Sequence, residues 1–240
     1  TGLQNPRRWR GRLRSHTRGK RMDVRKKVKA VLLIGPPGAG KTTVRKMVMK
    51  RKHGRRPTPK TYTFETMTHP ERAKGISQQK FEAQVDEAHG GFIELGVYSP
   101  ARVKGRWALA GSDLYSPPQR TRAKHVMTEF AATHPGGTVF MEGIAILNQK
   151  PFRDQLRRIA KSVKVVRIDT PVDESEKRWR KRNTEMVKAG KLKRVPPTPI
   201  ERWHEWNRKF DSYCDELDAE VFRCATHAEA SDALFNELKV

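Results

Sequence analysis

Residues 30–43 read AVLLIGPPGAGKTT, and this stretch limits the possible fold more strongly than any other. Its first five residues are apolar and predict a buried β-strand. The strand runs into the pattern G-x-x-x-x-G-K-T, the spacing of a loop that holds phosphate groups between a strand and a helix. Backbone N–H groups and the amino end of that helix favour anions. The chain is therefore predicted to bind a nucleoside triphosphate, ATP, through the loop residues Gly35, Pro36, Gly38, Ala39, Gly40, Lys41, Thr42 and Thr43.

Two side chains of this loop have a direct chemical role in such an arrangement. Lys41 is expected to reach the β- and γ-phosphates, and the Thr42 hydroxyl is expected to be a ligand of Mg²⁺. A second apolar strand, at 138–141, is followed by Glu142. Because ligands gather at the carboxyl ends of parallel strands, Glu142 is expected either to hold Mg²⁺ with Thr42 or to accept a proton.

The net charge is the second constraint, since 51 Lys and Arg against 26 Asp and Glu give +25. Residues 1–30 hold 12 of the basic residues against a single acid, and the rest of the chain still carries +14. An enzyme for a free mononucleotide needs no such surplus, whereas a protein that neutralises successive phosphates of a polymer does. The charge favours a nucleic-acid partner, with DNA first, over a basic surface that aids solubility or contacts an anionic membrane.

The remaining pattern predicts one folded domain. Residues 1–28 lack hydrophobic periodicity and predict a basic, disordered arm. Residues 29–240 alternate strands with helices, which predicts an α/β domain with a mainly parallel sheet flanked by helices. The expected strands are 30–34, 61–66, 92–98, 105–111, 138–141, 163–168 and 219–224, and the expected helices are 41–52, 78–88, 117–133, 152–161, 172–188, 200–217 and 228–238.

Some classes of protein are disfavoured by what the composition lacks. Two cysteines make neither a zinc site nor a disulfide framework. No apolar run approaches the roughly 18 residues of a membrane span, so a cytoplasmic location is expected. The oligomeric state is left open.

A pair of arginines falls in the expected helix 172–188. Arg178 and Arg182 are four residues apart and share a face, where two guanidinium groups would suit the charge on a phosphoryl group in transfer. The Lys- and Pro-rich break at 190–199 predicts a helical lid, about 173–210, that closes over the nucleotide. The alternative is a basic helix that is simply solvated.

The segment 105–118 places an acid between glycine turns and aromatic residues. Transfer to a hydroxyl needs a carboxylate that takes its proton, so Asp113 is the candidate general base, with Glu142 as the alternative. Arg102 and Arg106 lie nearby in sequence and are candidate contacts for the acceptor. A capped turn before the next helix would explain Asp113 equally well.

The phosphate loop, the strand that ends at Glu142 and the pair Arg178 and Arg182 resemble the P-loop kinases of nucleosides and nucleotides. The resemblance implies a parallel sheet, an acceptor-binding region at about 60–116 and an arginine-bearing lid. In its size and irregular middle the chain is also similar to small phage-style kinases.

The segment Thr66–Arg72 and the stretch 81–98, FEAQVDEAHGGFIELGVY, resemble the substrate-binding part of guanylate kinase, although the paired-arginine sequence of that family is missing. By this match Arg72, Glu94 and Tyr98 would face the acceptor. Three functions follow. The first is a kinase whose acceptor hydroxyl is carried by nucleic acid, either a 5′-hydroxyl end or a hydroxymethylated base in DNA of the phage type. The second is a kinase of free mononucleotides, and the third is a nucleic-acid-stimulated ATPase. A GTPase switch is disfavoured because the chain has no N-K-x-D sequence.

Overall fold

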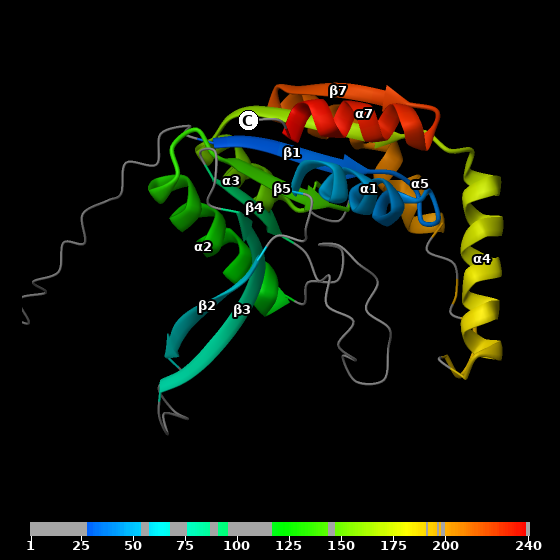
Figure 1. Ribbon diagram of the computed structural model, residues 1–240, viewed down its shortest axis with the longest axis horizontal. Helices are drawn as coiled ribbons and strands as arrows, with labels where there is room; N and C mark the ends of the chain where they lie inside the picture. The colour runs from blue at the N-terminus through cyan, green and yellow to red at the C-terminus, as the bar shows by residue number, and fades with distance from the viewer. Residues whose placement is uncertain are drawn as a thin grey trace, which may run out of the picture.

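The computed structural model describes residues 28–53, 58–67, 76–86, 91–95, 117–143, 147–190, 192–195, 197 and 200–238. In these residues one sheet has the strand order β2-β3-β4-β5-β1-β6-β7, with helices packed around it (Figure 1). The strands are β1 Val28–Ile34, β2 Thr58–Met67, β3 Ile76–Asp86, β4 Phe92–Leu95, β5 Thr138–Glu142, β6 Ala160–Ile168 and β7 Ala219–Cys224. The helices are α1 Lys41–His53, α2 Pro117–Thr133, α3 Lys150–Ile159, α4 Val172–Lys188, α5 Ile200–Arg208, α6 Phe210–Leu217 and α7 His227–Leu238.

The five strands β4, β5, β1, β6 and β7 are parallel to one another, which confirms the expected α/β class. β1 lies between β5 and β6 and is apolar throughout except at Lys29, as a strand covered on both faces must be. The pairing places Leu33 of β1 opposite Glu142 of β5 and Val166 of β6. The carboxyl ends of these three strands therefore meet at one edge of the sheet.

Alternate residues of β1 supply two separate cores. Val31 and Leu33 pack with α1 and α7 on one face of the sheet. Ala30 and Leu32 pack with α2, α3 and α6 on the other. The result is a sheet covered by helices on both faces, and the phosphate-loop segment joins the central strand to a helix on the first face.

The region expected to be the helix 78–88 is a strand, so that prediction was wrong. β3 pairs antiparallel with β2 along its whole length, from Thr58 opposite Val85 to Met67 opposite Ile76. Its Gln, Lys and Glu residues favour helix in isolation, but backbone pairing with β2 and β4 overrides that preference. The apolar residues at alternate positions, Phe81, Ala83 and Val85, have the period of a strand. The strand expected at 105–111 lies outside the described residues.

The helix expected at 200–217 is divided into α5 and α6. Lys209, with φ −101° and ψ 0°, lies between the two helices. The break lets α6 bury its own stripe against the sheet, which consists of Phe210, Tyr213, Cys214 and Leu217. The expected bounds of α2 and α4 are confirmed to the residue.

Two further expectations concern membrane spans and cysteines in the described ranges. No helix there has the length and apolar character needed to cross a membrane. Both cysteines, Cys214 and Cys224, are buried free thiols. Burial raises the pKa of the Cys214 thiol to about 12 and also raises the pKa of the Cys224 thiol.

Candidate functional site

The segment 35–40 connects β1 to α1 and has the conformation that its sequence predicts. Gly38 and Gly40 have φ of +91° and +81°, which residues with a side chain rarely adopt. Space is short as well, because a Cβ on Gly38 would lie 2.2 Å from the carbonyl oxygen of Ser175. At Gly35 the requirement is space alone, since a Cβ there would lie 3.1 Å from the oxygen of Ile168. The loop therefore packs tightly against its surroundings.

Lys41 is the first residue of α1 and turns back over the loop. Its Nζ donates hydrogen bonds to the carbonyl oxygens of Gly35, at 2.9 Å, and Pro36, at 3.0 Å. These bonds hold a positive charge at the carboxyl end of β1, where the helix dipole of α1 adds to it. The arrangement suits an anion, as the sequence predicts for this side chain.

Thr42 and Glu142, the two predicted metal ligands, lie together. Thr42 Oγ1 donates a hydrogen bond of 2.9 Å to Glu142 Oε1, and Glu142 is only 2% exposed. A hydroxyl and a carboxylate are hard oxygen donors of the kind that Mg²⁺ takes, and ligands on adjacent corners of its octahedron lie about 3 Å apart. The pair therefore fits Mg²⁺ both in chemistry and in spacing.

Glu94, predicted to contact the acceptor, lies on β4, the strand next to β5. Its carboxylate is fully buried and accepts two hydrogen bonds from the Arg45 guanidinium, one from Nε and one from Nη2. Arg45 lies three residues after Thr42 on α1, so the two side chains leave the same helix face. One face of α1 thus contacts the carboxylates of two neighbouring strands.

α4 approaches the loop at its first turns. Its buried residues Ser175, Trp179 and Asn183 are four apart and form one face, and the carbonyl of Ser175 and the Cβ of Trp179 lie against Gly38. Farther along, α4 extends beyond the sheet, at the end toward which β1 points (Figure 1). A helix at 172–188 beside the loop agrees with the sequence prediction.

The two arginines predicted on α4 are exposed in this conformation. The guanidinium of Arg178 pairs with the carboxylate of Glu174, one turn earlier. Arg180 pairs in the same way with Glu176. Arg182 is exposed to solvent. The structure thus brings Lys41, Thr42 and Glu142 together and leaves Arg178 bound to a neighbour on its own helix.

Five residues predicted for the acceptor side or for catalysis lie outside the described residues. They are Arg72, Tyr98, Arg102, Arg106 and Asp113.

One residue at the loop was missed by the sequence reasoning. His227, the first residue of α7, has its Nε2 2.8 Å from the carbonyl oxygen of Ala39. The sequence Thr226-x-x-Glu229 could have drawn attention to it. This pattern is typical of the start of a helix, and it sets the position of the residue that follows the threonine.

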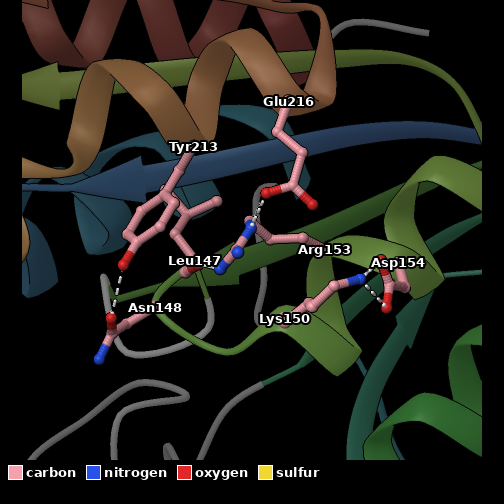
Figure 2. Close-up of polar contacts among 7 residues, drawn as sticks. All are labelled: Leu147, Asn148, Lys150, Arg153, Asp154, Tyr213 and Glu216. Atoms are coloured by element: carbon pink, nitrogen blue, oxygen red, sulfur yellow. Dashed lines mark hydrogen bonds and ion pairs between the residues drawn. The ribbon is translucent and has the colours of Figure 1, made fainter.

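The segment that follows β5 is held by a buried arginine (Figure 2). Arg153 of α3 donates from Nη1 to the carbonyl oxygen of Leu147 and from Nε to Glu216 of α6, both at 2.6 Å. Its guanidinium also lies over the Tyr213 ring, 4.2 Å from the centroid, and the Tyr213 hydroxyl donates to Asn148 at 2.8 Å. We call this group of four residues, Asn148, Arg153, Tyr213 and Glu216, the Arg153 brace.

A hollow of about 490 Å³ lies away from the phosphate loop. It is lined at the first residues of β6, the end opposite the phosphate loop, and by the last turns of α3 and α6. Its charged lining residues are of both signs and comprise Arg157, Arg158, Lys161, Asp154, Glu216 and Asp218. The hollow does not belong to the candidate site.

Comparison with known proteins identifies no family for the chain. No protein-family model matches it, and no curated protein matches it. Two similar solved structures are a gluconokinase from Sinorhizobium meliloti 1021 and a sugar kinase from Janibacter sp. HTCC2649, the latter unliganded. The first is 12% identical, with 89% of this chain and 93% of that chain covered, and the TM-score is 0.38. The second is 15% identical, with 88% and 94% covered, and the TM-score is also 0.38. Likeness at this level adds nothing to the topology described above.

Proposed function

We propose that the chain transfers the γ-phosphoryl group of ATP to a hydroxyl group carried by nucleic acid. The observation that carries the proposal is the contact between Thr42 and Glu142 next to Lys41. A cation, a hydroxyl and a buried carboxylate are thereby gathered at the carboxyl ends of two neighbouring parallel strands. Phosphoryl transfer needs these groups, because catalysis consists mostly of positioning and of neutralising charge on the phosphoryl oxygens.

The described residues have distinct roles in this proposal. Lys41 gives up its hydrogen bonds to the carbonyl oxygens of Gly35 and Pro36 and bonds phosphate oxygens instead. Its positive charge neutralises the negative charge of these phosphate oxygens. Thr42 and Glu142 would hold Mg²⁺, which supplies charge that offsets the negative β- and γ-phosphates.

The arginines of α4 would complete the neutralisation. Arg178 must leave Glu174 to reach a phosphoryl oxygen, and the exchange costs little because the exposed pair is weak. Arg182 lies on the same helix face, one turn farther on. Together α4 and α5 form the proposed lid, at about 173–210.

The acceptor hydroxyl must lose a proton during transfer. Asp113 is the proposed base, with Glu142 as the alternative. The acceptor itself is assigned to the region of about 60–116, through Arg72, Glu94, Tyr98, Arg102 and Arg106.

The charge of +25 supports a polymeric acceptor. Either a 5′-hydroxyl end or a hydroxymethylated base in DNA would present a hydroxyl group to the site. A kinase of free mononucleotides is the alternative, and the resemblance of the region around Glu94 to guanylate kinase favours it.

The test uses γ-labelled ATP with acceptors that differ only in their hydroxyl groups. One is an oligonucleotide with a 5′-hydroxyl, and the second carries a 5′-phosphate and one hydroxymethylated pyrimidine. The third carries a 5′-phosphate and no modified base, and a panel of mononucleotides completes the set. Lys41→Ala protein is the control for a contaminating kinase.

Label in the first or second oligonucleotide supports the proposal and identifies the hydroxyl. Label only in a mononucleotide overturns the polymeric acceptor and favours the alternative. Free labelled phosphate that is released only when DNA is added indicates a nucleic-acid-stimulated ATPase.

A further inference from the structure

His227 contacts the phosphate loop from the opposite end of the sequence. Its Nε2 lies 2.8 Å from the carbonyl oxygen of Ala39, 188 residues earlier. A carbonyl oxygen only accepts hydrogen bonds, so Nε2 carries the proton and donates it. The ring also packs on Gly40, where a Cβ would lie 2.4 Å from Nε2 and 2.6 Å from Cε1.

The position of His227 is fixed by the start of α7. The Thr226 hydroxyl accepts a hydrogen bond of 3.2 Å from the Glu229 N–H, and the Glu229 carboxylate accepts one of 2.9 Å from the Ala225 N–H. These two bonds satisfy backbone N–H groups at the start of the helix that have no partner within the helix. The helix is anchored in the core below the loop by its buried residues Ala230, Leu234 and Leu238. The imidazole is therefore presented by a rigid element.

The hydrogen bond sets the direction of one peptide group. In a trans peptide the C=O and the next N–H point in opposite directions, and the described chain has no cis peptide. Because His227 draws the Ala39 carbonyl toward α7, the N–H of Gly40 points away from α7. We propose that His227 is a positioning residue that aims the Gly40 N–H at a bound phosphate group. The inference rests on phosphate binding by this loop, as the proposed function requires.

The same geometry gives Gly40 two separate constraints. Its φ of +81° disfavours any side chain, and the imidazole occupies the place where a Cβ would be. The absence of a side chain at Gly40 thus leaves room for the His227 ring, which orients the peptide group between Ala39 and Gly40.

The experiment separates the hydrogen bond from the packing of the ring. His227→Gln keeps an N–H donor, whereas His227→Leu keeps much of the volume without a donor. Calorimetry gives the Kd of each protein for inorganic triphosphate and for ATP, both with Mg²⁺, and thermal unfolding gives Tm. His134→Leu is the matched control, since His134 stacks on Phe130 at the end of α2, next to the amino end of β5.

We expect His227→Leu to bind both ligands about five- to tenfold more weakly, the effect of one lost hydrogen bond. His227→Gln is expected to bind within about twofold of the original chain, and His134→Leu to match it. If His227→Leu does not fold, His227→Ala serves as the donor-free variant.

Three results would overturn the inference. One is equal affinity of the His227→Leu protein and the original chain, and another is a His227→Gln protein as weak as His227→Leu. The third is a loss with ATP alone, which would mean that the ring contacts the nucleoside rather than orienting the loop. Binding of triphosphate requires no acceptor, so a chain that binds but transfers nothing refutes only the kinase. A chain that does not bind triphosphate refutes both.

Discussion

At the scale of single residues, the candidate site depends on a few polar contacts in an apolar setting. Lys41 bonds two loop carbonyls and Thr42 bonds the buried Glu142, so each side chain is already placed before a ligand enters. Prepositioned charge is more effective than charge that must be gathered during the reaction.

Lys41→Ala removes the loop cation and its hydrogen bonds to the carbonyl oxygens of Gly35 and Pro36. We expect kcat for transfer to fall by about 10³-fold or more, because the charge on the phosphoryl oxygens is no longer neutralised. Far-UV circular dichroism should match that of the original chain. Near-normal turnover by a folded Lys41→Ala protein would remove the loop from catalysis.

Glu142→Gln tests whether Glu142, paired with Thr42, binds the metal ion. The amide oxygen still accepts the Thr42 hydrogen bond, so the fold is expected to persist while the negative charge is lost. The Mg²⁺ concentration for half-maximal transfer should rise by about tenfold or more. The measurement is a Mg²⁺ titration of the rate. An unchanged Mg²⁺ requirement with a slowed rate would instead identify Glu142 as the proton acceptor.

At the scale of elements, the Arg153 brace links α3, α6 and the segment after β5. Arg153→Met leaves the Leu147 carbonyl and the Glu216 carboxylate without their donor. We expect the free energy of unfolding to fall by about 3 kcal/mol, and Tyr213→Phe to lower it by about 1 kcal/mol.

Urea denaturation measures both effects on stability. Lys150→Met is the control, because Lys150 and Asp154 form an exposed pair on the same helix, and no measurable change is expected. The Lys150 ammonium nevertheless holds the pKa of the Asp154 carboxyl below its usual value. Equal stability of the Arg153→Met and Lys150→Met proteins would contradict the structural role of the brace.

The elements also show where sequence reasoning succeeds and where it fails. The loop, α2 and α4 could be predicted because motif spacing, proline and local periodicity all act within a few residues. β3 could not, since its polar residues favour helix and only pairing with β2 makes it a strand. The contact of His227 with Ala39 depends on how α7 packs, which periodicity does not reveal.

At the scale of the whole molecule, the excess of positive charge predicts how binding responds to salt. If the acceptor is a polymer, its affinity should fall by about 10³-fold or more between 50 and 200 mM salt, as for proteins with six or more phosphate contacts. Fluorescence anisotropy with a labelled oligonucleotide measures this, and binding of a mononucleotide is the comparison. A flat salt profile would argue against a polymeric substrate.

The buried thiols report on the integrity of the whole fold. A pKa of about 12 for Cys214 leaves about 10⁻⁴ of it as thiolate at pH 8, so iodoacetamide should label it only after unfolding. Because the folded pKa is raised, this group stabilises the fold fully below about pH 9. Its contribution is lost as the pH rises toward 12. Mass spectrometry with and without urea measures the labelling, and rapid labelling of the folded chain would contradict the burial.

The contact between His227 and Ala39 also has a consequence for biosynthesis. The ribosome makes Ala39 188 residues before its partner on α7, which takes about 10 to 40 s at ordinary rates of synthesis. Until α7 emerges and docks, the Ala39 carbonyl has no imidazole beside it, and the buried strand β1 also waits for β5 and β6. A nascent chain is therefore expected to gain its full affinity for nucleotide only after α7 has been made and has docked.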